Sequence, residues 1–157
     1  MAEREGVFGP RDQAAGIEEV RGWLREIDEH ARSAERVRYR FVATLAETGE
    51  IIGTTRVHID DTWDLGGSIG YGIRTPHRGR GYATEAAGLV LQFAFTKLGL
   101  HRIEATIEPE NLASQRVVEG LGMRREGLLK RRLKEPDGWR DALLYGITEE
   151  EWRERGS

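Results

Sequence analysis

The sequence predicts a single α/β (α+β) domain built on a mixed, mainly antiparallel sheet flanked by helices. Two observations support this class. Segments of alternating apolar and polar residues surround two segments with helical periodicity, and a glycine-rich loop joins one strand to one of these helices. The 157 residues are the usual size of one domain, so we assign 1–157 to it, with 1–12 as a loose lead-in.

The first half of the chain is expected to form a helix and three antiparallel strands. Apolar residues recur at helical spacing over 17–33, which indicates an amphipathic helix. The β-rich segment that follows is broken by the turn ETGE and predicts strands near 38–46 and 50–59. A third strand, SIGYGIRT at 68–75, ends before a proline.

The second half is expected to alternate helices and strands. A helix at 84–99 has one apolar face, and the strand HRIEATIE follows it. A third helix opens at Asn111 and stops at Gly120 or Gly122, because glycine suits a helix C-terminus. Two further strands, joined by the turn PDGW, form a hairpin, and TEEEW begins a short tail.

Composition argues against several classes of protein. A net charge of -3 and a pI of about 5.9 disfavour a general nucleic-acid binder. The chain has no cysteine, which excludes disulfides and thiolate sites, and its four histidines lack metal-binding spacing, so we expect no metal. We find no membrane-spanning apolar run and no signal-peptide pattern, so we expect no membrane association and a cytoplasmic location.

The stretch PHRGRGYATEA, residues 76–86, is the strongest candidate for a ligand site. Gly79 and Gly81 permit unusual φ values and a close approach of the backbone. Arg78 and Arg80 add positive charge, and the helix that follows presents free N–H groups and the positive end of its dipole. Such a loop suits a pyrophosphate. A plain tight turn with solvated arginines is the structural alternative.

Two common glycine-rich nucleotide motifs do not fit this loop. The Walker pattern needs Gly-Lys-Ser or Gly-Lys-Thr at its end. The dinucleotide fingerprint needs a third glycine where this chain has Thr84, within a series of parallel strands. A different nucleotide-like ligand is therefore indicated.

Arg78, Gly81 and Ala83 form the pattern R-x-x-G-x-A, and in this pattern the chain resembles the GNAT superfamily of N-acetyltransferases. The segments GYATEAAGLVLQFAFTKLGLHRIEATIEPENLASQRVVEGLGMRREGLLK and GWRDALLYGITEEEW are similar to its RimJ/RimL-like, ribosomal-protein-alanine branch. The resemblance covers residues 38–152 with the elements in order.

The resemblance implies a strongly twisted sheet that splits into a V and binds acetyl-CoA as cosubstrate. The pantetheine would pair in the V with the backbone of Ile73, Arg74 and Thr75. The pyrophosphate would lie on the loop and helix start formed by Arg78, Gly79, Arg80, Gly81, Tyr82, Ala83 and Thr84.

The implied reaction is direct acetyl transfer, in a ternary complex, to a primary amine of a protein N-terminus or a small molecule. The alternative function is a GNAT-like module that binds acetyl-CoA as a sensor or without catalysis.

Two residues of the third helix are implied in binding and catalysis. The family's asparagine at the position of Asn111 holds the cofactor arm, although asparagine is a good N-cap in any protein. Ser114 lies one turn later on the same side of the helix. In several relatives a serine or tyrosine here protonates the CoA thiolate, and a local backbone bond is the alternative role.

The general base has several candidates. Relatives often carry a glutamate where this chain has Ser68, and some branches carry one where it has Thr106. We favour Glu104, on the same strand face as Thr106, with a purely structural role as its alternative. The other candidates are His58, whose side-chain type titrates in the right range, and three acidic residues of the next loop, Asp60, Asp61 and Asp64.

The N-terminal part departs from the family pattern. Relatives open with a strand and a helix ahead of the helix expected at 17–33, and MAEREGVFGPRDQ does not read as a strand. We therefore expect the usual first strand and helix to be lacking. That would leave a sheet edge at 38–46 open to pairing with another chain, and a two-fold homodimer is the simplest expectation.

Overall fold

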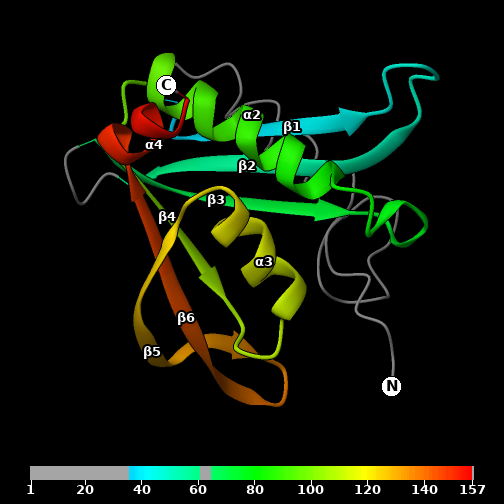
Figure 1. Ribbon diagram of the computed structural model, residues 1–157. Helices are drawn as coiled ribbons and strands as arrows, with labels where there is room; N and C mark the ends of the chain where they lie inside the picture. Colours follow the sequence, from blue (N-terminus) through cyan, green and yellow to red (C-terminus); the bar gives the residue numbers. More distant parts are fainter. Residues whose placement is uncertain (1–35, 61–64, 157) are drawn as a thin grey trace.

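The structure is a computed structural model that describes residues 36–60 and 65–156. Figure 1 shows its arrangement. The helix expected at 17–33, the lead-in and the question of the missing first strand lie outside these residues. The strands are β1 (Arg38–Thr44), β2 (Ile51–Asp60), β3 (Gly66–Ile73), β4 (Arg102–Ile107), β5 (Arg124–Glu135) and β6 (Gly138–Thr148). The helices are η1 (Thr75–His77), α2 (Tyr82–Thr96), α3 (Leu112–Gly120) and α4 (Glu149–Arg155).

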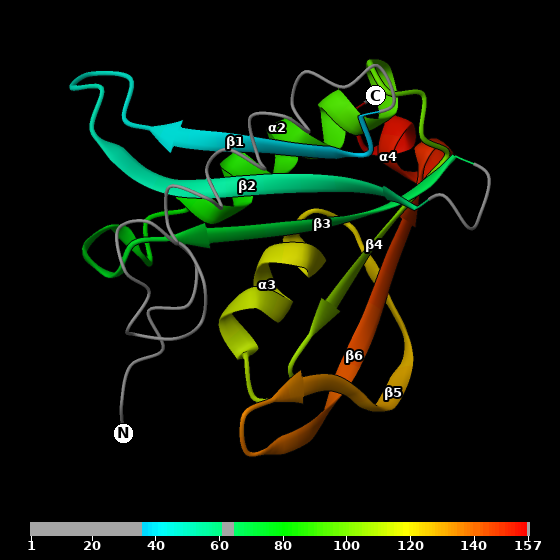
Figure 2. The same cartoon turned by 180° about the vertical axis from the view of Figure 1, so that it is seen from behind.

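The described strands form one mixed, mainly antiparallel sheet, as the sequence predicts. Their order is β1-β2-β3-β4-β6-β5, and only β3 and β4 pair in parallel. That parallel pairing lasts for three residue pairs, from Gly66 with Arg102 to Ser68 with Glu104. Beyond Ser68 the two strands diverge, as both views of the ribbon show (Figures 1 and 2). The divergence confirms the V-shaped sheet.

Element ends differ from the prediction where local capping decides them. β3 runs two residues earlier than expected, and α2 begins at Tyr82 because Gly81, with φ of 84°, serves as its N-cap. The segment expected to be a tail forms α4 instead. A capping box starts this helix, in which the side chains of Thr148 and Glu151 each bond the other residue's backbone N–H.

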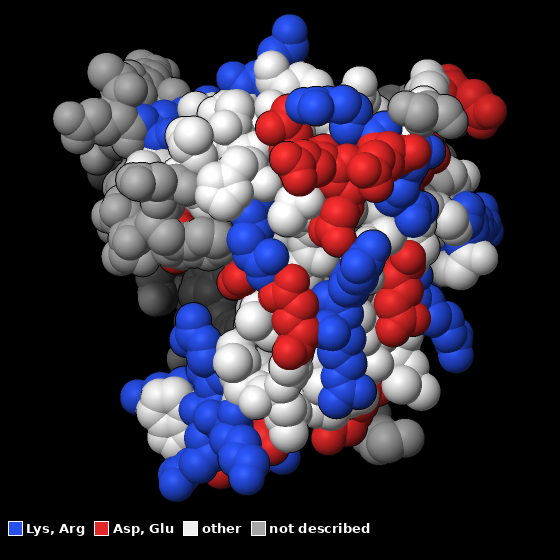
Figure 3. Space-filling model, turned by 60° about the vertical axis from the view of Figure 1, so that its left-hand side comes forward, with Lys and Arg blue, Asp and Glu red and all other residues white. Residues whose placement is uncertain are grey.

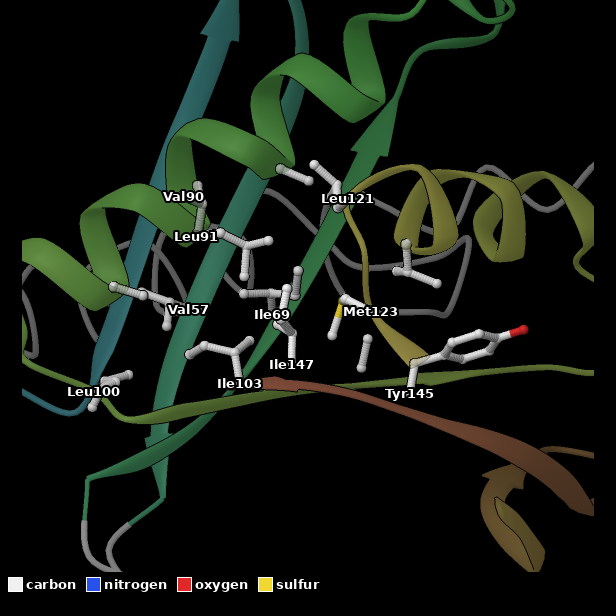
Figure 4. Close-up of a cluster of buried hydrophobic side chains, with 14 of the residues drawn as sticks. Val57, Ile69, Val90, Leu91, Leu100, Ile103, Leu121, Met123, Tyr145 and Ile147 are labelled. Atoms are coloured by element: carbon white, nitrogen blue, oxygen red, sulfur yellow. The ribbon is translucent and has the colours of Figure 1, made fainter. Parts of the chain in front are cut away.

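The hydrophobic core lies between the sheet and the helices α2 and α3. α2 crosses one face of β1 and β2, and the view from behind shows these strands in front of it (Figure 2). Leu91 of α2 is fully buried among apolar residues of the central strands (Figure 4). Met123 is 3% exposed and belongs to the same cluster. The core therefore fixes α2 and its glycine loop against the sheet.

Charged side chains of both signs alternate over the face shown in Figure 3, and Lys and Arg gather toward its lower end, where Figure 1 places the β5–β6 hairpin. The exposed residues of this hairpin include Lys130, Arg131 and Arg132. Arg131 has a φ of 51°, and its N–H donates to Asp141 at 2.8 Å. This hairpin is therefore locally basic, although the net charge of the whole chain is -3.

Candidate active site

The glycine loop between β3 and α2 needs glycine for its backbone conformation. Gly79 and Gly81 have φ values of 75° and 84°, in the left-handed region that side chains disfavour. A Cβ built on either residue meets nothing within 4 Å, so crowding by the protein is not the reason. The two left-handed glycines let the loop turn directly into α2, so that the backbone N–H groups of the loop are followed by those of the first helical turn.

The loop presents a continuous series of hydrogen-bond donors. Within the described residues, no hydrogen bond uses a backbone N–H of residues 79–84, and the first bond of α2 runs from Glu85 N to Gly81 O at 3.1 Å. No side chain caps the helix. Unused N–H groups at a helix start, together with the helix dipole, favour an anion. This arrangement is the one expected for a pyrophosphate site.

The arginines of the loop have different positions. Arg78 folds back, and its Nε donates to Ile73 O at 2.9 Å, which ties the loop to the end of β3. Arg80 is exposed and makes no hydrogen bond or ion pair with the described residues. His77 anchors the loop on the other side through Nε2, which lies 3.1 Å from Oε1 of Glu50. Arg80 is thus the cation that remains available to a ligand.

At the end of β3, several of the backbone groups that were expected to pair with pantetheine are already hydrogen-bonded within the protein. The Arg74 N–H donates to Ile52 O at 2.8 Å, and the Arg74 carbonyl accepts from His77 N at 2.9 Å. The N–H of Arg74 is therefore already used. Hydrogen-bonding directions alternate along an antiparallel pair, so the N–H and C=O groups of Ile73 face away from β2. The carbonyl of Ile73 already accepts from Arg78 Nε at 2.9 Å, so the Ile73 N–H is the group that faces the V unused by the described residues. The carbonyl of Thr75 accepts from Arg78 N at 3.2 Å.

Asn111 caps the helix α3, whose N-terminus lies between the arms of the V. Its Oδ1 accepts from Ser114 N at 3.1 Å, as the N-cap interpretation predicts. Ser114 is also tied to the sheet, because Tyr71 of β3 donates its hydroxyl to the Ser114 carbonyl at 3.0 Å. Burial raises the pKa of Tyr71 to about 12. Tyr71 thus positions the helix turn that carries Ser114.

A second tyrosine holds α3 from the other arm of the V. The buried side chain of Tyr145, on β6, donates its hydroxyl to Glu119 at 2.9 Å. Burial and the neighbouring Glu119 carboxylate raise the pKa of Tyr145, so the hydroxyl keeps its proton. Both tyrosines have apolar surroundings and hydroxyls that reach α3. Neither tyrosine was predicted from the sequence to contact α3, because a position in a strand does not by itself indicate a contact with a helix.

Glu104 is held in an ion pair. Arg102 Nη2 lies 3.0 Å from Oε1 of Glu104, and the same guanidinium contacts Glu126 of β5. The hydrogen bond to Glu126 raises the pKa of Arg102, and the contact with Glu104 adds to this rise, whereas burial acts in the opposite direction. A Cβ at Gly146 would lie 2.5 Å from both Arg102 and Glu126, so glycine is what lets this cluster lie flat on the sheet. No hydrogen bond within the described residues uses Oε2 of Glu104.

The predicted site residues therefore form two groups. The loop residues 78–84, the end of β3 and the Asn111–Ser114 turn lie on the side of the sheet that α2 and α3 occupy. Glu104 lies on β4 with its side chain on the opposite face, since its neighbours Ile103 and Ala105 are buried in the core. Asp61 and Asp64 lie outside the described residues.

Two further properties concern the described residues only. No group of three or more His, Asp or Glu side chains among them is placed to hold a metal ion. Among the same residues, none of the helices has the length and apolar character that crossing a membrane requires.

Comparisons with known proteins agree with this geometry. Residues 4–124 match the acetyltransferase (GNAT) domain. The uncharacterized N-acetyltransferase YnaD of Bacillus subtilis is 44% identical over 84 residues, which are 54% of this chain and 49% of YnaD. The probable N-acetyltransferase YjcK of the same organism is 36% identical over 130 residues, 82% of this chain and 72% of YjcK.

A solved structure shows the same fold. Mycobacterium smegmatis RimJ in complex with CoA-disulfide superposes with a TM-score of 0.75 and 37% sequence identity, over 84% of this chain and 63% of that one. The chain thus spans about half of YnaD and less than two thirds of the RimJ chain. The domain match, the likeness to RimJ and the V-shaped sheet with its glycine loop agree. This chain belongs to the acetyltransferase (GNAT) domain family, on the RimJ/RimL-like side.

Proposed function

We propose that this protein transfers an acetyl group from acetyl-CoA to a primary amine by direct attack in a ternary complex. One observation carries the proposal: six consecutive backbone N–H groups, at residues 79–84, make no hydrogen bond with the described residues and lead into the start of α2. Such a donor series suits the pyrophosphate of acetyl-CoA, the donor of the family. The acceptor we propose is a protein N-terminus or a small-molecule amine, since relatives include the Escherichia coli ribosomal protein uS5-alanine N-acetyltransferase.

The chain offers a binding partner to each part of acetyl-CoA. The loop N–H groups and the exposed Arg80 would hold the pyrophosphate. The free edge of β3 at Ile73 would pair with the pantetheine amides. Asn111, at the N-terminus of α3, would hold the arm near its thioester end. These groups come from three elements that the core fixes together, so the site is preorganised.

The catalytic groups we propose flank the opening of the V. The backbone N–H of Tyr71 faces away from β2 and can stabilise the oxyanion of the tetrahedral intermediate. Ser114 would donate a proton to the departing CoA thiolate. Glu104 was expected to be the base, but its Oε1 is held by Arg102 at 3.0 Å. We therefore propose that Glu104 attracts the cationic form of the acceptor amine.

We also propose that two copies of the chain form a dimer. β1 is the edge strand of the described sheet. Beside it lies a groove of about 560 Å³ between β1 and α2, next to the exposed apolar residues Val42 and Leu89. An open strand and an apolar groove together favour contact with another chain. The cytoplasmic location expected from the sequence stays a prediction.

Calorimetry with acetyl-CoA tests whether the glycine loop binds the pyrophosphate. Gly81→Val places a β-branched residue at a φ of 84° and moves the N–H groups of the loop. We expect its affinity for acetyl-CoA to fall more than tenfold, or about 1.4 kcal/mol. Gly99→Val is the matched control, because Gly99 has a φ of 65° and equally open surroundings but lies at the far end of α2. Equal affinities of the two variants would overturn the assignment.

Release of CoA with a panel of primary amines tests the reaction. The wild type should release CoA with at least one amine, and acetyl-CoA binding without any amine-dependent release would support the sensor instead. Ser114→Ala should bind acetyl-CoA as the wild type does but turn over more slowly, because its contact forms in the transition state.

A further inference from the structure

His58 belongs to a polar row that crosses the sheet. It pairs with Ser68 on β3, and Ser68 pairs with Glu104 on β4. Paired residues of neighbouring strands point to the same face, and successive residues of one strand point to opposite faces. The residues next to these three belong to the core under α2: Val57, Ile69 and Ile103. His58, Ser68 and Glu104 therefore share the face opposite α2.

The hydrogen bond of His58 determines which ring nitrogen is basic. Nδ1 lies 3.2 Å from the carbonyl oxygen of Val37. A carbonyl can only accept, so Nδ1 carries the hydrogen, and Nε2 of the neutral ring has a lone pair. No hydrogen bond within the described residues uses Nε2. The backbone thus fixes the ring in the tautomer that a proton acceptor needs.

The row lies where the V begins. The pair of Ser68 and Glu104 is the last one between β3 and β4. The loop before α2 and the turn at Ser114 approach the gap from the helix side of the sheet. An amine that enters from the other face would meet His58 and Glu104 first. The two substrates would then reach the gap from opposite faces, as direct transfer requires.

We propose that His58 is the general base of this acetyl transfer and that Glu104 holds the acceptor's ammonium group beside it. The inference rests on the proposed function. Nε2 takes one proton from the ammonium, and the neutral nitrogen attacks the thioester carbonyl. As the C–S bond breaks, the second amine proton passes to the thiolate, with Ser114 as the donor in the relay. The products are the acetylamide and CoA thiol, and His58 returns its proton to water.

The charged groups around His58 bear on any pH dependence. Within the described residues they lie on the adjacent strands of the same face. They are Arg38 opposite on β1, Arg56 and Asp60 two residues away on β2, and Glu104 with Arg102 beyond Ser68. A pH dependence of the rate that disappears when His58 alone is replaced would therefore report on His58 and not on these groups.

His58→Asn tests the proposal, because the asparagine amide can keep the bond to Val37 O while the basic nitrogen is lost. With an alanine-starting peptide and spermidine as amine probes, we expect kcat/KM for the amine to fall about a hundredfold at pH 7. The limb of the pH profile that the histidine produces should disappear, and the affinity for acetyl-CoA should stay unchanged. His101→Asn is the matched control, since His101 is exposed outside this row.

A second variant separates chemistry from structure. His58→Ala should regain amine-dependent CoA release when imidazole is added, which a merely structural role would not produce. Glu104→Gln should raise KM for the amine and keep the pH limb. An active His58→Asn protein with the wild-type pH profile would overturn the assignment of His58 as the base and leave the proposed function standing. A wild type that releases no CoA with either probe would overturn the proposed function and the base with it.

Discussion

At the scale of single residues, Tyr71 shows how one hydroxyl connects the sheet to the helix α3. Its bond to the Ser114 carbonyl is partly buried, and burial raises its pKa to about 12. The unfolded chain ionises near pH 10, so the stabilising effect is complete below pH 10 and is lost as the pH rises to 12. We expect Tyr71→Phe to be less stable than the wild type at pH 8 by about 1 kcal/mol. Urea unfolding from pH 8 to 12 should show this difference vanish, and a difference independent of pH would contradict the account.

At the scale of elements, α4 depends on its cap more than on its length. It has seven residues, and its first turn is held by the reciprocal bonds of Thr148 and Glu151. The bond from the Thr148 backbone is the main cause that lowers the pKa of Glu151. Thr148→Ala should cost about 1 kcal/mol of unfolding free energy, measured by urea denaturation, with acetyl-CoA affinity unchanged. Thr148→Ser keeps the hydroxyl and should restore most of that loss, whereas equal losses in both variants would assign the effect to the lost methyl group.

At the scale of the whole molecule, the proposed dimer depends on the edge of the sheet. β1 ends the described sheet, and Val42 on it is 58% exposed. We expect light scattering at micromolar concentration to give about twice the 17.8 kDa mass of one chain. Val42→Lys should shift this mass toward the monomer, because a lysine on an edge strand opposes pairing. Leu128→Lys is the control, since Leu128 is similarly exposed on β5 at the other edge. A wild-type monomer would show that the edge is covered within the chain.

The sequence by itself determined the features that depend on neighbours along the chain. The alternation of apolar residues predicted the β-rich segments, and the loop around Gly81 was predicted to take unusual φ values before a helix, as its φ of 84° shows. Asn111 was predicted as an N-cap, and its side chain makes that bond. Such features are local, because capping and φ preferences act within a few residues.

Only the tertiary structure decided the contacts between segments far apart in the chain. Tyr71 reaches Ser114 across 43 positions, and Arg102 binds Glu126 across 24. The row of His58, Ser68 and Glu104 exists because of the pairing of three strands. A shift of one residue in that register would turn each side chain to the other face. No local pattern encodes the register, because the packing of the core selects it.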